Sequence, residues 1–151
     1  MKKTYSTLLI IYTSFIFSAF VYLLLGWILS RSGWHPLLNT AAANPIFIGL
    51  VVILASDIFA MFQVKAALFR QGVSMPLNQE QLHRYIVSRF LILFALSEIP
   101  AIAGLVFFLL SGNFGRFIIL CGISFVAFAV VKPSLTFLEE FERNRTTKTQ
   151  S

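Results

Sequence analysis

Two acidic residues lie inside long apolar stretches of this sequence, and they are its clearest candidates for chemistry. Asp57 is the only charged residue in the stretch 45–64, and Glu98 is the only one in the stretch 90–110. An acidic side chain at the centre of a bilayer costs about 2.5–3.5 kcal/mol on insertion scales, so such residues usually meet a partner helix, a cavity or an ion. Both acids are therefore candidate ion-binding residues, and Ser97, directly before Glu98, is a third candidate.

The spacing predicts that the two acids lie at similar depth. Asp57 comes 12 residues after Pro45 and Glu98 comes 12 residues before Leu110, which places each about 18 Å from the outer end of its helix. If the two helices are antiparallel neighbours, the acids can share a proton, because two like charges in a low dielectric do not both ionise cheaply. We then expect at least one of them to be protonated at neutral pH. The alternative is that each is a neutral acid that hydrogen-bonds a hydroxyl or the backbone and holds two helices together.

Glu98 has the more specific surroundings. Pro100 follows it by two residues and has no N–H to donate to the carbonyl of Leu96, which frees a polar group close to the carboxyl. Small residues permit a neighbouring helix to approach closely, and four of them surround this position: Ala95, Ala101, Ala103 and Gly104.

The segment around Glu98 resembles the ion-carrying helix of the rotary ATPase proteolipid, subunit c of the F- and V-type enzymes. In that family a carboxylate within the membrane is followed by a short apolar stretch, often with proline, and then by a Gly-Leu pair, as Pro100 and Gly104-Leu105 follow Glu98 here. Arg70-Gln71 falls where the family has its cytoplasmic Arg-Gln-Pro loop. The resemblance implies that Glu98 binds H⁺ or Na⁺. The preceding stretch has one glycine, Gly49, in place of a glycine-rich helix, so we do not expect a rotor ring.

Four apolar stretches must position these residues: 8–29, 45–64, 90–110 and 117–138. A membrane span needs about 20 apolar residues; the fourth stretch reaches this length only if it extends past Lys132, whose stem can snorkel. The chain is 58% hydrophobic and 12% charged, whereas a soluble domain has about 25% charged residues. The fold class predicted is an all-α integral membrane protein with four transmembrane helices in one domain, residues 1–138.

The first apolar stretch has a second interpretation as a secretory signal. Lys2 and Lys3 precede it, and Phe17-Ser18-Ala19 loosely resembles a cleavage site. The stretch continues without interruption to Leu29, however, which is longer than the ~7–15 residues of a signal core. We therefore expect an uncleaved first span.

The basic residues predict the orientation. With four spans, ten of the twelve Lys and Arg residues fall on the side of the two termini and the second loop, and Arg31 and Arg116 fall on the other side. Basic residues concentrate on the cytoplasmic side, so both termini are predicted to be cytoplasmic. The same bias accounts for the net charge of +6 without nucleic acid as a partner.

The remaining segments are loops and a tail. A turn is expected at residues 72–76, followed by a capped helix start at Asn78-Gln79-Glu80. The polar tail, residues 139–151, is expected to begin as a helical extension and to end in a disordered Thr/Lys/Gln segment.

The functional prediction is a multi-pass protein of the plasma membrane that handles H⁺ or Na⁺ at Glu98. The alternative is a structural or assembly subunit of a larger membrane complex, with the buried acids as interhelical contacts. The expected partners are the lipid bilayer and either further copies or other membrane subunits. We expect no enzyme, because the sequence has no Ser/His/Asp set, no histidine within a span and no phosphate-binding loop. No cofactor and no metal site are expected either, since Cys121 is the only cysteine.

Overall fold

The computed structural model describes residues 2–33, 35–38, 40–74 and 78–149, with the side chains of 40–41, 68–74 and 144–149 left out. This part of the chain is all-helical, which confirms the all-α part of the predicted class. Its helices are α1 (Lys2–Arg31), α2 (Thr40–Ser74), α3 (Gln79–Ser111), α4 (Phe114–Val131) and α5 (Leu135–Thr149). Four segments are long and apolar enough to cross a membrane: Lys2–Arg31, Ala42–Ala67, Gln79–Ser111 and Phe114–Val131.

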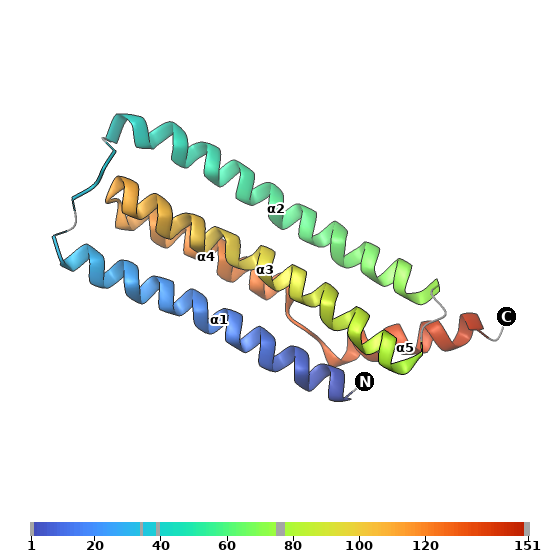
Figure 1. Cartoon of the computed structure of the whole chain (residues 1–151). Helices are drawn as coiled ribbons and strands as arrows, with labels where there is room; N and C mark the ends of the chain where they lie inside the picture. Colours follow the sequence, from blue (N-terminus) through green and yellow to red (C-terminus); the bar gives the residue numbers. More distant parts are fainter. Residues whose placement is uncertain (1, 34, 39, 75–77, 150–151) are drawn as a thin grey trace.

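The helices form a bundle with α3 and α4 at its centre. Helices α1 and α2 both contact this central pair, but in the described part of the chain they do not contact each other. Figure 1 shows them on opposite sides of it. The burial follows this arrangement, because 44% of the apolar window of α3 and 39% of that of α4 are buried, against 11% in α1 and in α2. The outer two helices therefore present most of their apolar surface to the surroundings.

The two ends of the described chain lie at the same end of the bundle. The start of α1 and the short helix α5 are close together in Figure 1, and the two helices are in contact. This arrangement is what an even number of spans requires.

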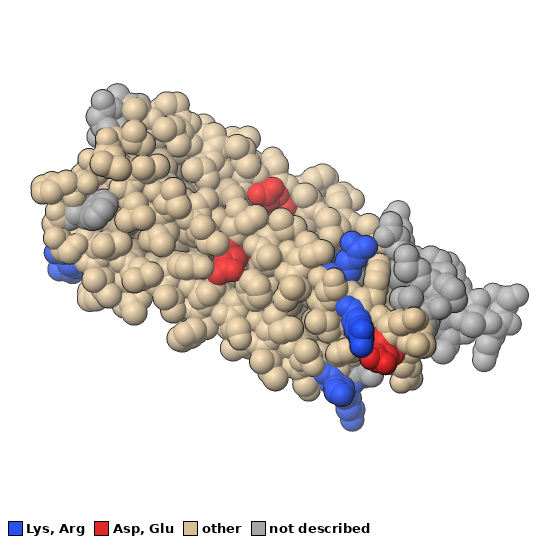
Figure 2. Space-filling model, in the orientation of Figure 1, with Lys and Arg blue, Asp and Glu red and all other residues tan. Residues whose placement is uncertain are grey.

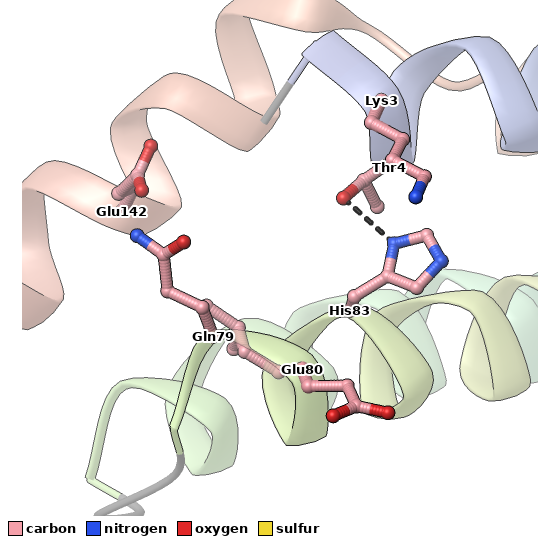
Figure 3. A pocket seen from close by; sticks show the side chains of 7 residues that line it. Lys3, Thr4, Gln79, Glu80, His83 and Glu142 are labelled. Carbon is pink, nitrogen blue, oxygen red and sulfur yellow. Dashed lines mark hydrogen bonds between the residues drawn. The ribbon is translucent and has the colours of Figure 1, made fainter.

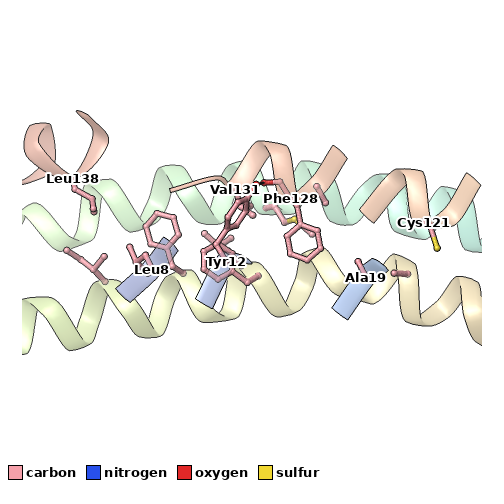
Figure 4. Close-up of a cluster of buried hydrophobic side chains, with 14 of the residues drawn as sticks. Leu8, Tyr12, Ala19, Cys121, Phe128, Val131 and Leu138 are labelled. Atoms are coloured by element: carbon pink, nitrogen blue, oxygen red, sulfur yellow. Dashed lines mark hydrogen bonds between the residues drawn. The ribbon is translucent and has the colours of Figure 1, made fainter. Parts of the chain in front are cut away.

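Aromatic and aliphatic side chains fill the space between the helices. The largest fully buried side chains are mostly phenylalanines from the central pair, and Figure 4 shows Leu8, Tyr12 and Ala19 of α1 in one cluster with Phe128 and Val131 of α4 and Leu138 of α5. Dispersion and shape decide such packing in lipid, because the lipid tails are as apolar as the side chains.

Two glycines allow the close approach of helices. A Cβ at Gly104 of α3 would lie 2.9 Å from the Cβ of Leu120 on α4, and a Cβ at Gly26 of α1 would lie 2.2 Å from Cε1 of Phe117. The prediction that small residues near Glu98 permit close packing is confirmed for Gly104 and for Ala101, which is fully buried. Ala95 is exposed and Ala103 is half-buried.

Local signals fix the ends of α3. Asn78 caps its start: the Asn78 side chain accepts a hydrogen bond from the Gln81 backbone N–H, and the Gln81 side chain accepts one from the Asn78 backbone N–H. This confirms the expected capped start. At the other end Gly112 has a φ of 66°, a left-handed conformation that glycine adopts at little cost, and it forms the tight turn to α4.

The second loop differs from the expected turn. Helix α2 continues to Ser74, so residues 72–74 of the turn predicted at 72–76 are helical, and residues 75–76 lie outside the described residues. The polar end of the chain also differs, because α5 continues to Thr149 where a disordered segment was expected.

The fourth apolar stretch is not one continuous helix to residue 138. Helix α4 ends at Val131, three residues separate it from α5, and Pro133 is the middle one. Proline has no N–H for the helix ladder and disfavours helical geometry in the residue before it. The carbonyls at the end of α4 are then satisfied from outside: Lys65 Nζ donates to the Val130 carbonyl at 2.8 Å, and the Tyr12 hydroxyl donates to the Phe128 carbonyl at 3.2 Å.

Candidate functional site

The carboxyl of Glu98 is bound by two hydroxyl groups of α1. Oε1 of Glu98 accepts a hydrogen bond from Tyr22 Oη at 2.9 Å and another, shorter one from Ser18 Oγ. Ser18 and Tyr22 are four residues apart and therefore lie on the same face of α1. All three side chains are half-buried. The site thus joins α1 to α3 at about the middle of both helices.

Ser18 has a second acceptor within reach. Its hydroxyl lies 2.8 Å from the backbone carbonyl of Phe15 as well as in contact with Glu98. A hydroxyl has one hydrogen and cannot donate to both acceptors at once, but its oxygen can also accept. With Glu98 ionised, Ser18 donates to the carboxylate. With Glu98 protonated on Oε1, the acid donates to Ser18, and Ser18 donates to the Phe15 carbonyl.

The site can therefore hold Glu98 in two protonation states without moving its heavy atoms. The Tyr22 hydroxyl donates to Oε1 in both states, and only the Ser18 hydrogen changes its direction. The second carboxyl oxygen, Oε2, has no hydrogen bond to the described residues, which leaves it available to a proton, a cation or water.

Ser97 does not belong to this site, although it is next to Glu98 in the sequence. Its hydroxyl donates to the Leu93 carbonyl at 2.8 Å and lies 3.6 Å from the sulfur of Met61 on α2. Its side chain is fully buried. Consecutive residues of a helix point in different directions, so Ser97 faces α2 and α4 while Glu98 faces α1.

The backbone near Pro100 is satisfied from α4. Ser124 donates a short hydrogen bond from its hydroxyl to the carbonyl of Ser97, one turn before the proline. Serine side chains commonly complete the backbone bonding of membrane helices that contain proline. The proline was expected to free a polar group close to the carboxyl of Glu98. The hydrogen bond from Ser124 to the Ser97 carbonyl instead joins α3 to α4 and does not involve Glu98.

Asp57 is not brought together with Glu98. It lies on α2, on the other side of the central pair from α1, and is half-buried. Asp57 has no hydrogen bond or ion pair with the described residues, whereas both partners of Glu98 come from α1. In Figure 2 the acidic side chains on the middle of the body are separated by uncharged surface. The two acids do not contact each other, so the structure has no direct contact through which they could share the proton expected from the sequence.

Sequence reasoning missed Ser18 and Tyr22 as partners of Glu98. The available signal was a pair of hydroxyl residues spaced i, i+4 in an apolar helix, but nothing in the sequence said which acid they would meet. It also missed the contact of Lys65, a residue of α2 whose ammonium donates to the Val130 carbonyl at the end of α4. The side chains of Arg70 and Gln71, which support the resemblance to subunit c, lie outside the described residues.

The oxygens at Glu98 define the chemistry of the site. Among the described residues, no group of three or more His, Cys, Asp or Glu side chains could hold a metal ion. One carboxyl and two hydroxyls instead offer hard oxygen atoms. The chain matches no protein-family model, no curated protein and no solved structure. What the fold itself defines is an all-helical protein with four helices long and apolar enough to cross a membrane among the described residues.

Proposed function

We propose that this protein binds H⁺ or Na⁺ at Glu98 within the membrane. The observation that carries the proposal is the arrangement of Ser18, which can donate to Glu98 or accept from it because the Phe15 carbonyl is a second acceptor. Ionisable groups within membrane helices are costly and commonly serve proton or ion pathways. The resemblance of the Glu98 segment to subunit c supports the same function.

Chemical labelling of the carboxyl tests this proposal. A hydrophobic carbodiimide reacts with a protonated acid in an apolar surrounding, and mass spectrometry locates the modified residue. We expect modification of Glu98 in the full chain in detergent, and no modification at this position in Glu98→Gln. The matched control is Asp57→Asn, which removes an acid at similar depth and should leave the labelling of Glu98 unchanged. Protection of Glu98 by Na⁺ but not by K⁺ would identify sodium as the ligand.

Ion flux gives the decisive readout. The chain is reconstituted in vesicles, and H⁺ or Na⁺ entry is followed with an indicator dye. Glu98→Gln keeps the size and hydrogen bonding of the side chain but removes its titration, so flux is expected to fall to the level of empty vesicles. Flux that survives in Glu98→Gln would show that Glu98 does not carry the ion.

A structural role is the second candidate, and a specific observation favours it. Both hydroxyls that bind Glu98 come from one neighbouring helix, so these hydrogen bonds also hold α1 against α3. In this case the acid is an interhelical contact of a structural or assembly subunit. Glu98→Gln would then leave assembly and function intact, while Glu98→Leu would prevent assembly.

We further propose that the protein lies in the plasma membrane with both termini in the cytoplasm. The ends of the described chain lie on the same side of the bundle (Figure 1), and Figure 2 shows Lys and Arg gathered mainly at that end of the face in view. Reporters fused to the two ends of the chain, one active only in the cytoplasm and one only outside it, test the orientation. Opposite signals from the two ends would contradict it.

A further inference from the structure

A polar cavity lies at the end of the bundle where the chain begins. It has a volume of about 270 Å³, and its polar lining comes from α1 (Lys3, Thr4), α3 (Gln79, Glu80, His83) and α5 (Glu142). Figure 3 shows Thr4, Gln79, His83 and Glu142 around a space between the three helices, with the Glu80 carboxyl directed away from it. The volume is enough for several water-sized groups, and the cavity is separate from the site at Glu98.

Contacts within the lining hold the cavity open. The Thr4 hydroxyl and His83 Nδ1 are 2.9 Å apart and connect α1 to α3, and Thr4 is buried. When Thr4 donates to Nδ1, the other ring nitrogen of His83 carries the hydrogen and can donate to a ligand. Glu80 forms an ion pair with Arg84 at 2.7 Å. The contact between Thr4 and His83 therefore fixes one wall of the cavity, while Glu80 and Arg84 are exposed at its rim.

The depth of the cavity corresponds to the lipid headgroups. Thr4 comes four residues before the apolar stretch 8–29, or about 6 Å along the helix axis. The headgroup layer on each side of a bilayer is about 5–8 Å thick. The apolar side chain of Leu82 also lines the cavity, which suits a ligand that continues into the acyl region.

The lining carries both signs of charge. Lys3 is positive and Glu142 is negative, whereas the carboxylate of Glu80 is already paired with Arg84. A ligand with only negative charge would meet Glu142, and a ligand with only positive charge would meet Lys3. A zwitterion that combines a phosphate with a primary ammonium matches both, because Lys3 and His83 can bind the phosphate, and Glu142 and the Gln79 side-chain oxygen can accept hydrogen bonds from the ammonium.

We propose that this cavity binds a phosphoethanolamine group, supplied by phosphatidylethanolamine of the surrounding leaflet. The ammonium of this headgroup donates to Glu142, and its phosphate accepts from Lys3. A choline headgroup has the same charges but no N–H to donate, and a glycerol headgroup has no ammonium. The cavity should therefore distinguish among lipids that differ only in the headgroup.

Native mass spectrometry of the full chain in mild detergent tests the proposal. Phosphatidylethanolamine, phosphatidylcholine and phosphatidylglycerol with identical acyl chains are added at equal concentration. We expect phosphatidylethanolamine to be retained about tenfold more strongly than the other two lipids. This ratio corresponds to the contribution of one hydrogen bond to a charged group. Equal retention of phosphatidylcholine by the unmodified chain would overturn the proposal.

Variants of the lining locate the binding. Glu142→Gln should abolish the preference for phosphatidylethanolamine over phosphatidylcholine, and Glu139→Gln, an exposed acid of α5 that does not line the cavity, should retain it. Lys3→Gln should weaken retention of both lipids, with Lys2→Gln as its control. Gel filtration and helix content measured by circular dichroism confirm that each variant is folded. A preference that persists in Glu142→Gln would contradict the assignment.

Competition with soluble phosphoethanolamine distinguishes the two sources of the same chemistry. If the bilayer lipid is the ligand, millimolar phosphoethanolamine does not displace it, because the acyl chains hold the headgroup at a high local concentration. Displacement at equimolar concentration would assign the cavity to a soluble zwitterion and would overturn the lipid assignment.

Discussion

The two sides of the central α3·α4 pair are held together differently. On the α1 side, polar contacts occur along the whole helix: Thr4 with His83, Tyr12 with the Phe128 carbonyl, and Ser18 and Tyr22 with Glu98. On the α2 side, Asn44 accepts from Arg116 and Lys65 donates to the Val130 carbonyl, while nearer the middle of α2 the Ser97 hydroxyl contacts the sulfur of Met61, a weak acceptor. Asp57, in the middle of α2, has no partner among the described residues.

Asp57 and Glu98 are expected at similar depth, but hydroxyl groups satisfy only Glu98. The neighbours of such an acid, and not its position along the helix, therefore decide whether it is satisfied. Helix α1, which has direct hydrogen bonds to Glu98 near its middle, is also expected to separate less readily from the central pair than α2. Four pairs of variants, in order of expected effect, test this comparison between the two sides.

The largest difference is expected from glycine substitutions. A Cβ at Gly26 of α1 would lie 2.2 Å from Phe117, whereas a Cβ at Gly49 of α2 would have no atom within 4 Å. Gly26→Val should lower the free energy of unfolding by about 3 kcal/mol, the upper range for overpacking, and Gly49→Val should leave it nearly unchanged. Unfolding in mixed detergent, followed by circular dichroism, measures both. A large loss in Gly49→Val would mean that α2 is packed more closely than α1.

Replacement of the two acids by leucine comes second. Glu98→Leu leaves the Tyr22 hydroxyl without its acceptor and should destabilise the protein by about 2 kcal/mol. Asp57→Leu removes an acid that has no partner and should be neutral or stabilising, since leucine inserts more favourably into the membrane. The same unfolding assay compares them. Equal destabilisation by both changes would show that Asp57 has a partner equivalent to that of Glu98.

The third pair concerns the ammonium that binds the end of α4. Lys65→Met keeps the length of the side chain but removes the donor to Val130, with an expected loss of about 1.5 kcal/mol for a hydrogen bond from a charged group. Lys132→Met is the control, because Lys132 is exposed at the break between α4 and α5. Hydrogen exchange of the last turn of α4 should rise in Lys65→Met and stay constant in the control. Unchanged exchange in Lys65→Met would show that this cap contributes little.

The smallest effect is expected from single tyrosine hydroxyls. Tyr22→Phe removes one donor from Glu98 and should cost about 0.6 kcal/mol, the average for hydrogen bonds between membrane helices. Tyr85→Phe is the matched control, because the Tyr85 hydroxyl is buried and has no hydrogen-bond partner in the described part of the chain. Its loss should be neutral or stabilising. The melting temperature of each variant measures the effect. A larger fall in melting temperature for Tyr85→Phe than for Tyr22→Phe would contradict this assignment of the hydroxyl contacts.

Much of the fold could be predicted because it depends on local properties of the chain. The four apolar stretches, the cap at Asn78 and the turn at Gly112 follow from hydropathy, side-chain hydrogen bonding and backbone freedom, which act within a few residues. The break after Val131 also has a local cause in Pro133. A longer helix was nevertheless predicted from the sequence, because a membrane span needs about 20 residues. In the structure α4 has 18 residues, and Lys65 and Tyr12 satisfy carbonyls at its end.

The candidate site was predictable only in part. From the order of residues alone, Glu98 and Asp57 each stand singly in an apolar stretch, where an ionised acid would be costly within a membrane, and they are expected at similar depth. That Glu98 faces Ser18 and Tyr22 while Ser97 and Asp57 lie elsewhere emerges from the packed bundle. The reason is physical: which side chains meet depends on the rotation of each helix about its axis and on the choice of its neighbour, and the packing of the whole bundle sets both.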